Sequence, residues 1–213
     1  MMAPMDKRRF LQCIAASMAG RASAFALVGA GIAGCSESAP KQTFNAVDLT
    51  GADYAKDFAL TDADGRRRTL ADFKGKVVVL FFGYAQCPDV CPTTMTEMAQ
   101  VKQQLGADGD RLQVVFVTVD PERDTPAVMK AYTQAFDPSI VALIPTPAEL
   151  AALSKDFKFY YKKVDGSTPT SYSMDHSAAS YVYDPAGRLR LYARYGAGVA
   201  PMVADVKTLL ATG

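Results

Sequence analysis

The hydrophobic pattern of the chain is dominated by two continuous apolar runs, at residues 76–82 and 112–119. Both are rich in β-branched residues and neither alternates with polar positions, which is typical of strands buried on both faces of a sheet. Between the two runs, apolar residues recur at helical spacing after Pro92. They form one stripe that consists of Met95, Met98, Val101 and Leu105. The pattern therefore predicts a strand, an amphipathic helix and a second strand in this part of the chain.

The rest of the pattern continues this alternation. A helix is expected at 126–136, because Thr125 suits the N-cap and Pro126 the first helical position. The other expected elements are strands at 140–144 and 159–164, helices at 147–157 and 201–210, a polar loop at 165–173, and two hairpins, 58–70 around Asp62–Gly65 and 177–195 around Asp184–Gly187. Alternating strands and helices predict the α/β class. The order fits a thioredoxin-like fold, in which helices flank a mixed central sheet with an extra N-terminal hairpin and a C-terminal hairpin.

The first 35 residues have the pattern of an export segment rather than of a folded element. The basic residues Lys7, Arg8 and Arg9 precede an apolar, small-residue stretch that ends in Ile-Ala-Gly-Cys at Cys35. This order is typical of secretory signals, and the four residues resemble a bacterial lipobox. We expect residues 1–34 to be removed and Cys35 to be lipidated, with 35–50 as a tether and 51–213 as the folded domain. An uncleaved transmembrane anchor and plain secretion remain alternatives. All three place the domain outside the cytoplasm, and lipidation places it on the periplasmic side of a bacterial membrane.

Composition and charge narrow the function classes. Of 213 residues, 49% are hydrophobic and 21% charged, which is typical of a globular protein. No run of about 20 uncharged apolar residues is present, which excludes a multi-pass membrane protein. The formal net charge of +1 gives no indication of nucleic-acid binding. The sequence has four cysteines and a single histidine. Because Cys13 and Cys35 fall in the export segment, Cys87 and Cys91 are the thiols left for chemistry in the domain.

Cys87 and Cys91 lie in the segment Cys-Pro-Asp-Val-Cys-Pro, directly after a buried strand and before a helix. Ligands of α/β folds gather at the carboxyl ends of such strands. Each cysteine precedes a proline, which disfavours helical backbone, so we expect a tight loop with both sulfurs facing outward. The N-terminus of the following helix would lower the pKa of a thiol there. Two such thiols can chelate a soft metal or close a disulfide, and the export segment permits either state.

His176 is expected to lie just before the strand that begins at Ser177, near the edge of the sheet, where Asp175 could orient its ring. From the residues alone, a ligand and an ordinary surface histidine both remain open. The segment Asp120–Pro126 follows the second buried strand. We favour strand termination and helix capping as its role over forming a wall of the site. Met95, Met98 and Met129 are expected in the core, and Met174 is the methionine most worth considering as a ligand.

Three motifs together resemble the Sco/SenC family of thioredoxin-like copper chaperones for cytochrome c oxidase assembly. They are Cys-Pro-Asp-Val-Cys-Pro, Val119–Pro126 and Asp175-His176, and the resemblance runs from about Asp57 to Leu210. It implies that Cys87, Cys91 and His176 bind copper as Cu(I), Cu(II) or both. Thiolates favour Cu(I) and imidazole also suits Cu(II), so the chemistry of this ligand set agrees. The implied partners are a copper-site subunit of the oxidase or another copper chaperone, together with the membrane.

Other functions remain open at this point. A thiol-disulfide oxidoreductase could use Cys87 and Cys91 as its redox pair and keep the copper-site cysteines of the oxidase reduced. Their spacing is C-x₃-C rather than C-x-x-C, which counts against general reductase activity. A peroxidase motif is not seen in the sequence. A zinc site with two Cys and one His is chemically possible. We therefore expect a binding and delivery protein rather than an enzyme.

Overall fold

The computed structural model describes residues 42–168 and 171–212. Within this part of the chain, one sheet has eight strands in the order β1-β10-β9-β4-β5-β6-β2-β3. The strands are β1 (Val47–Asp48), β2 (Ala59–Asp62), β3 (Arg67–Thr69), β4 (Val77–Gly83), β5 (Leu112–Thr118), β6 (Val141–Ile144), β9 (Ser180–Tyr183) and β10 (Leu189–Ala193). The mixed α/β architecture is the one expected from the sequence. The expected signal segment at 1–34, Cys13 and the lipidation site Cys35 lie outside the described residues.

The centre of the sheet consists of the two apolar runs. β4 pairs with β5 in parallel register, with Val77 opposite Leu112 and Gly83 opposite Thr118. Every residue of both strands is buried, as the lack of polar alternation predicts. β6 adds a third parallel strand beside β5, whereas β9 pairs antiparallel with the other side of β4. The sheet is therefore mixed, and the carboxyl ends of β4 and β5 lie side by side.

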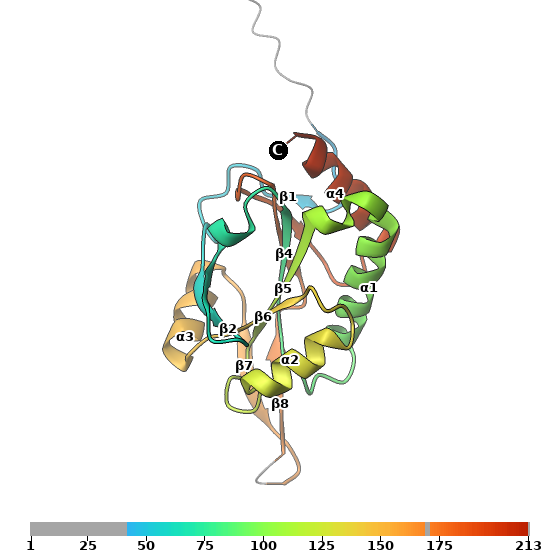
Figure 1. Cartoon of the computed structure of the whole chain (residues 1–213). Helices are drawn as coiled ribbons and strands as arrows, with labels where there is room; N and C mark the ends of the chain where they lie inside the picture. The colour runs from blue at the N-terminus through green and yellow to red at the C-terminus, as the bar shows by residue number, and fades with distance from the viewer. Residues whose placement is uncertain (1–41, 169–170, 213) are drawn as a thin grey trace, which may run out of the picture. The chain divides into compact units, whose positions relative to one another are not determined.

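Helices cover both faces of the sheet. Figure 1 shows α1 (Val90–Leu105) and α4 (Val199–Thr212) side by side on one face and α3 (Pro147–Asp156) on the other. α2 (Pro126–Gln134) contacts β6. The apolar stripe of α1 is buried as predicted, and so are Met95, Met98 and Met129. Short 3₁₀ segments, Leu70–Phe73 and Gly106–Arg111, lead into β4 and β5. Among the described residues, no helix is long and apolar enough to cross a membrane.

The two hairpins expected from turn residues are present. β2 pairs antiparallel with β3, and β9 with β10. At the other end of the chain, β1 lies within the segment assigned to the tether. Val47 and Asp48 pair with β10, and the Asp205 carboxylate accepts hydrogen bonds from the backbone N–H groups of Asn45 and Ala46 at 2.9 Å each. Contacts with the folded domain therefore begin by Asn45.

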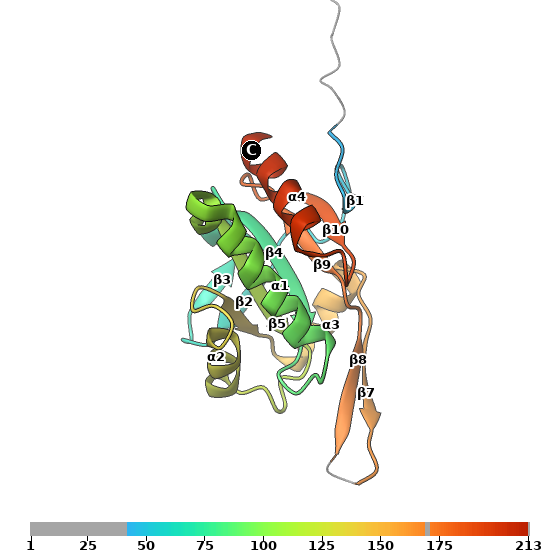
Figure 2. The ribbon, with the colours of Figure 1, turned by 90° about the vertical axis from the view of Figure 1, so that its right-hand side faces the viewer.

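The segment between α3 and β9 differs from expectation. β7 (Tyr161–Asp165) and β8 (Tyr172–His176) form a separate two-stranded antiparallel sheet, which projects from the body as a long hairpin (Figure 2). The expected polar loop at 165–173 is thus partly strand. His176 is the last residue of β8 and not the residue before a strand at the edge of the main sheet. In β8, Tyr172, Met174 and His176 alternate with exposed polar residues, so these three side chains share one face of the strand.

Candidate metal centre

The two cysteines lie where β4 ends and α1 begins, at the expected place but in different surroundings. α1 starts at Val90 with Asp89 at its N-cap, so Cys91 is in the first helical turn and Pro92 follows within it. Cys91 is fully buried, whereas Cys87 is half-buried. The prediction that both sulfurs face outward is therefore wrong for Cys91. The first turn of α1 packs against the end of β4, and this contact turns the Cys91 side chain inward.

The structure brings Cys87, Cys91 and His176 together. Their ligand atoms all lie within 4.8 Å of one another, and the Cys91 Sγ is 3.5 Å from the His176 Nε2. Both cysteines are free thiols. Cys91 and His176 are 85 positions apart in the sequence, so it is the folding of the β7–β8 hairpin onto the body that creates this cluster. The three side chains could hold one metal ion.

The His176 ring is held by groups other than the predicted Asp175. The His176 Nδ1 lies 2.9 Å from the backbone carbonyl of Ser177, which fixes the Nε2 toward the sulfurs when Nδ1 carries the proton. The edges and faces of Phe81 and Tyr84 contact the ring in nearly perpendicular geometry. Asp175 is exposed, because neighbouring residues of a strand point to opposite faces. The predicted role for Asp175 is therefore wrong.

Hydrogen bonding shifts the pKa values of the two thiols in opposite directions. A hydrogen bond from Cys91 lowers the pKa of Cys87 to about 3, with further help from His176 and from the backbone N–H groups of Asp89 and Cys91, although burial opposes this shift. The same hydrogen bond and burial raise the pKa of Cys91. Cys87 is therefore the half-buried thiolate at neutral pH, and Cys91 is the buried thiol that donates to it.

The segment Asp120–Pro126 caps a helix and also contacts the loop that carries Cys87. The Thr125 side chain accepts the Val128 backbone N–H at the start of α2, and Pro126 is at N1, as predicted. Arg123, however, bonds to Asp120, to the Gln86 side chain and to the Tyr172 backbone carbonyl. The preference for a purely structural role is therefore too narrow. The sequence feature that could have indicated these contacts is Arg123, a basic residue between Asp120 and Asp124 directly after a buried strand.

Asp124 holds the loop that carries Cys87 through a hydrogen bond to its backbone. It is fully buried, and its Oδ2 accepts hydrogen bonds from the Ala85 backbone N–H at 3.1 Å and from the Thr118 hydroxyl at 2.6 Å. Burial raises the pKa of this carboxyl. Because Ala85 lies two residues before Cys87, Asp124 ties the loop that carries the cysteine to the end of β5. Sequence patterns alone did not predict this function for Asp124.

Two cavities flank the base of the β7–β8 hairpin. The first, of about 380 Å³, is lined by Cys87, Asp89, Tyr160, Met174 and His176 among others, so the centre is open to an approaching molecule. The second, of about 410 Å³, lies over the end of β5 and shares Met174 with the first. Met174 is nearly buried and is on the same face of β8 as His176.

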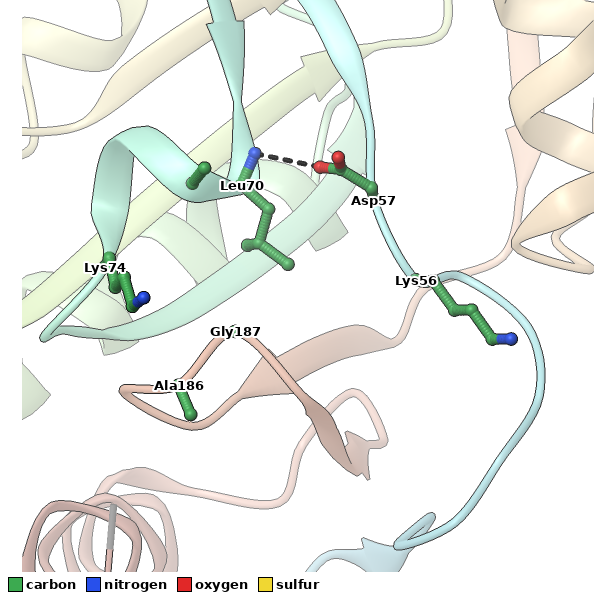
Figure 3. A pocket seen from close by; sticks show the side chains of 7 residues that line it. Lys56, Asp57, Leu70, Lys74, Ala186 and Gly187 are labelled. Atoms are coloured by element: carbon green, nitrogen blue, oxygen red, sulfur yellow. Dashed lines mark hydrogen bonds between the residues drawn. The ribbon is translucent and has the colours of Figure 1, made fainter.

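A further hollow shares no residue with the metal centre. It is lined by the two lysines Lys56 and Lys74, which Figure 3 shows on opposite sides, together with Asp57, Leu70 and the turn at Ala186–Gly187. The Asp57 carboxylate already accepts the Leu70 backbone N–H at 3.0 Å. None of the residues that line this hollow is a thiol or an imidazole, so it does not extend the candidate site.

Comparison with known proteins agrees with this centre. The SCO1/SenC family model matches residues 47–211. Among curated proteins, "Protein SCO2 homolog, mitochondrial" of Bos taurus is 37% identical over 171 residues, which cover 76% of this chain and 64% of the bovine protein. The chain thus spans less than two thirds of that relative.

Solved structures show the same similarity. The structure of Bradyrhizobium japonicum ScoI with copper bound is 40% identical, with a TM-score of 0.66 over 72% of this chain and 97% of that one. A SCO1/SenC family lipoprotein from Bacillus anthracis is 25% identical, with a TM-score of 0.62 over 74% of this chain and 98% of that one. The residues matched by the family model, 47–211, include all three candidate ligands.

Proposed function

Because the chain belongs to the SCO1/SenC family, we propose that it is a copper metallochaperone for the assembly of cytochrome c oxidase. The observation that carries this proposal is the convergence of Cys87, Cys91 and His176 within 4.8 Å. The copper-bound structure of the related ScoI supports copper as the metal. Copper is the cargo in this proposal, and its acceptor is a copper-site subunit of the oxidase or another copper chaperone.

The donor set suits a protein that carries copper in either oxidation state. Two thiolates bind Cu(I) strongly, and an imidazole adds the nitrogen donor that Cu(II) prefers. Cys87 is already a thiolate at neutral pH, so only Cys91 must lose a proton when the metal binds. The half-buried Cys87 and the adjoining cavity leave one side of the centre open. A partner that supplies its own ligands could therefore take over the metal there.

We further propose that the domain is tethered to the periplasmic side of a bacterial membrane through a lipid on Cys35. The Ile-Ala-Gly-Cys sequence and the similar lipoprotein from Bacillus anthracis support this proposal. Two acyl chains on the Cys35 terminus are enough for stable anchoring. Mass spectrometry of the native protein should find Cys35 lipidated and residues 1–34 absent. An intact N-terminus at Met1 or Met2 would contradict lipidation and favour the uncleaved anchor.

The second candidate is a thiol-disulfide oxidoreductase that keeps the copper-site cysteines of the oxidase reduced. The asymmetry of the thiols favours it, since Cys87 has the low pKa and partial exposure of an attacking thiol. In that reaction the Cys87 thiolate attacks a partner disulfide and forms a mixed disulfide. Cys91 then loses its proton and displaces the partner thiolate, so a Cys87–Cys91 disulfide forms and the partner gains two electrons.

Copper loading of a reduced domain tests the first proposal. We expect protein lacking residues 1–35 to bind one equivalent of Cu(I) or Cu(II), with a thiolate-to-Cu(II) absorption band in the latter case. The variant His176→Ala should retain Cu(I) on its two sulfurs and should bind Cu(II) much more weakly, in a shorter-lived centre. The matched control is Cys87→Ser/Cys91→Ser, which should lose both. Equal Cu(II) spectra and affinity in wild type and His176→Ala would remove His176 from the site.

The oxidation state of the thiols separates the two candidates. A chaperone requires both thiolates, so protein with a Cys87–Cys91 disulfide should bind copper weakly, and reduction should restore binding. A dithiol reductase needs no imidazole ligand, so His176→Ala should retain most of its exchange activity toward a peptide disulfide. Equal copper affinity before and after reduction would refute the chaperone proposal, whereas absent disulfide exchange in the reduced protein would refute the reductase.

A further inference from the structure

The position of His176 depends on contacts that hold the β7–β8 hairpin to the body. The hairpin pairs with no strand of the central sheet in the described part of the chain. Consequently, main-chain sheet hydrogen bonds do not fix the distance between the His176 imidazole and the sulfurs. On β8, the face that carries His176 also carries Met174 and Tyr172, because alternate residues of a strand share a face. The contacts on that face therefore set the position of the imidazole.

Arg123 joins the hairpin to the two other segments of the centre. Its Nη1 donates to the Tyr172 backbone carbonyl at 2.9 Å and to the Gln86 Oε1 at 3.1 Å. Its Nε donates to the Asp120 carboxylate. Tyr172 lies four residues before His176 on β8, and Gln86 directly precedes Cys87. One guanidinium thus bridges the His176 strand, the Cys87 loop and the end of β5.

The surroundings of Arg123 make this bridge strong. The Arg123 side chain is 18% exposed and that of Asp120 is 3% exposed, so solvent screens the pair little. The guanidinium also lies 3.5 Å from the centre of the Tyr172 ring, and the Tyr172 hydroxyl donates to the Asp120 Oδ1 at 2.9 Å. A lysine could supply the charge but not the planar fork that reaches three acceptors.

Other links between the hairpin and the body are fewer or weaker. Lys163 on β7 pairs with Glu122, but both side chains are largely exposed, and such pairs contribute little. The Tyr84 side chain hydrogen-bonds the Met174 backbone. This bond joins β8 to the end of β4 and does not reach Gln86 or the end of β5. Among these contacts, that of Arg123 alone spans all three segments.

We propose that Arg123 is a positioning residue that clamps the β7–β8 hairpin and thereby sets the approach of the His176 imidazole to copper. The proposal rests on the proposed function, since it treats Cys87, Cys91 and His176 as the copper ligands. Arg123 acts through His176 and touches no metal itself. Loss of the clamp therefore weakens Cu(II), which depends on the imidazole, and leaves Cu(I) on the two sulfurs. Residues that support metal ligands in this way typically change metal affinity by about 10- to 100-fold.

The test uses the full-length chain with Cys13 and Cys35 replaced by serine throughout, so that Cys87 and Cys91 are its thiols. In Arg123→Lys we expect Cu(II) affinity to fall by about 10-fold or more, with an altered Cu(II) absorption spectrum and Cu(I) affinity within about threefold of wild type. The matched control is Arg68→Lys, which perturbs a similar ion pair with buried Asp62 (2.7 Å) on a distant strand. The control should change neither affinity.

A double-mutant cycle shows whether Arg123 acts through His176. If it does, Arg123→Lys should cause no further loss of Cu(II) affinity in the His176→Ala background, whereas an independent structural role predicts that the two losses add. Additive losses, or wild-type Cu(II) affinity in Arg123→Lys, would overturn the proposal. Should Arg123→Lys not fold, Tyr172→Phe provides the second variant. It removes the bond to Asp120 but keeps the ring, and it should weaken Cu(II) in the same selective way.

A measurement without copper separates this proposal from the proposed function. Hydrogen exchange of backbone amides at 172–177 in the apo-protein should be about 10-fold faster in Arg123→Lys, while exchange in β4 and β5 stays unchanged. Unchanged exchange at 172–177 would overturn the clamp even if copper binds. Failure of the wild type to bind copper, combined with faster exchange in the variant, would refute the chaperone function and leave the clamp in place.

Discussion

Replacing Gly83 with alanine should disturb the metal centre, because the added methyl group would press on the Cys91 sulfur. Gly83 ends β4 and is buried next to Cys91. A Cβ at this position would lie 2.7 Å from the Cys91 Sγ, 2.7 Å from the Phe81 Cε1 and 2.8 Å from the Phe116 Cζ. All three separations are well below the 3.5–4.0 Å of normal carbon contacts. The backbone of Gly83 is not left-handed, so the effect is one of space rather than of backbone strain.

The size of the effect follows from how little its neighbours can move. Phe81, Phe116 and Cys91 are each fully buried in the core, and added volume in a close-packed core costs about 1–3 kcal/mol. For a domain of this size, such a loss lowers the Tm by roughly 2–12 °C. The Cys91 sulfur lies 3.5 Å from the His176 Nε2. A shift of the sulfur by a few tenths of an ångström would therefore also change the ligand geometry.

Urea denaturation of the reduced apo-protein measures the loss, and copper titration measures the effect on the site. We expect Gly83→Ala to lower both the free energy of unfolding and the Cu(II) affinity. The control is the same substitution in the Cys91→Ala background, where the Sγ is gone and the additional loss should be smaller because only the two rings remain crowded. A change in unfolding free energy below about 0.5 kcal/mol, together with wild-type copper binding, would refute the packing argument.

Three further outcomes are expected. Because the pKa of Cys87 is lowered, the thiolate persists as the pH falls, so the alkylation rate of Cys87 by iodoacetamide should stay flat from about pH 8 to 5 instead of falling tenfold per unit as for a free thiol. Asp124→Ala leaves the Thr118 hydroxyl and the Ala85 N–H without their acceptor and should cost about 2 kcal/mol or more in urea denaturation; wild-type stability would contradict this. Tyr183→Phe removes a buried 2.7 Å hydrogen bond to the Ala55 carbonyl and should cost about 1–2 kcal/mol, and an unchanged denaturation midpoint would count against it.

Much of the fold could be predicted because its elements are encoded locally. The uninterrupted apolar runs predicted β4 and β5 within a residue or two, since only strands buried on both faces lack polar alternation. Thr125 and Pro126 predicted the start of α2, because a helix cap is also a local feature. It involves a residue only three positions away. The family resemblance, carried by three short motifs, also pointed to Cys87, Cys91 and His176.

The failures concern side chains whose surroundings come from distant segments. Nothing near Cys91 in the sequence shows that α1 presses it against β4 and buries it. The alternation in 172–176 indicates a strand, but it does not show whether that strand joins the main sheet, because pairing depends on segments distant in the sequence. His176 was therefore placed at the wrong edge, and Asp175 was expected to hold its ring.

The sequence by itself determined the central strands and the flanking helices and which residue types are available for chemistry. The tertiary structure alone decided how the two thiols differ, which carbonyl orients His176, and that Arg123 spans three segments of the site. The physical reason is that period and capping act over a few residues, whereas burial, hydrogen bonding and pKa depend on atoms that only folding brings together. Cys91 and His176 illustrate the difference, because they are 85 positions apart in the sequence but their Sγ and Nε2 atoms lie 3.5 Å apart in the structure.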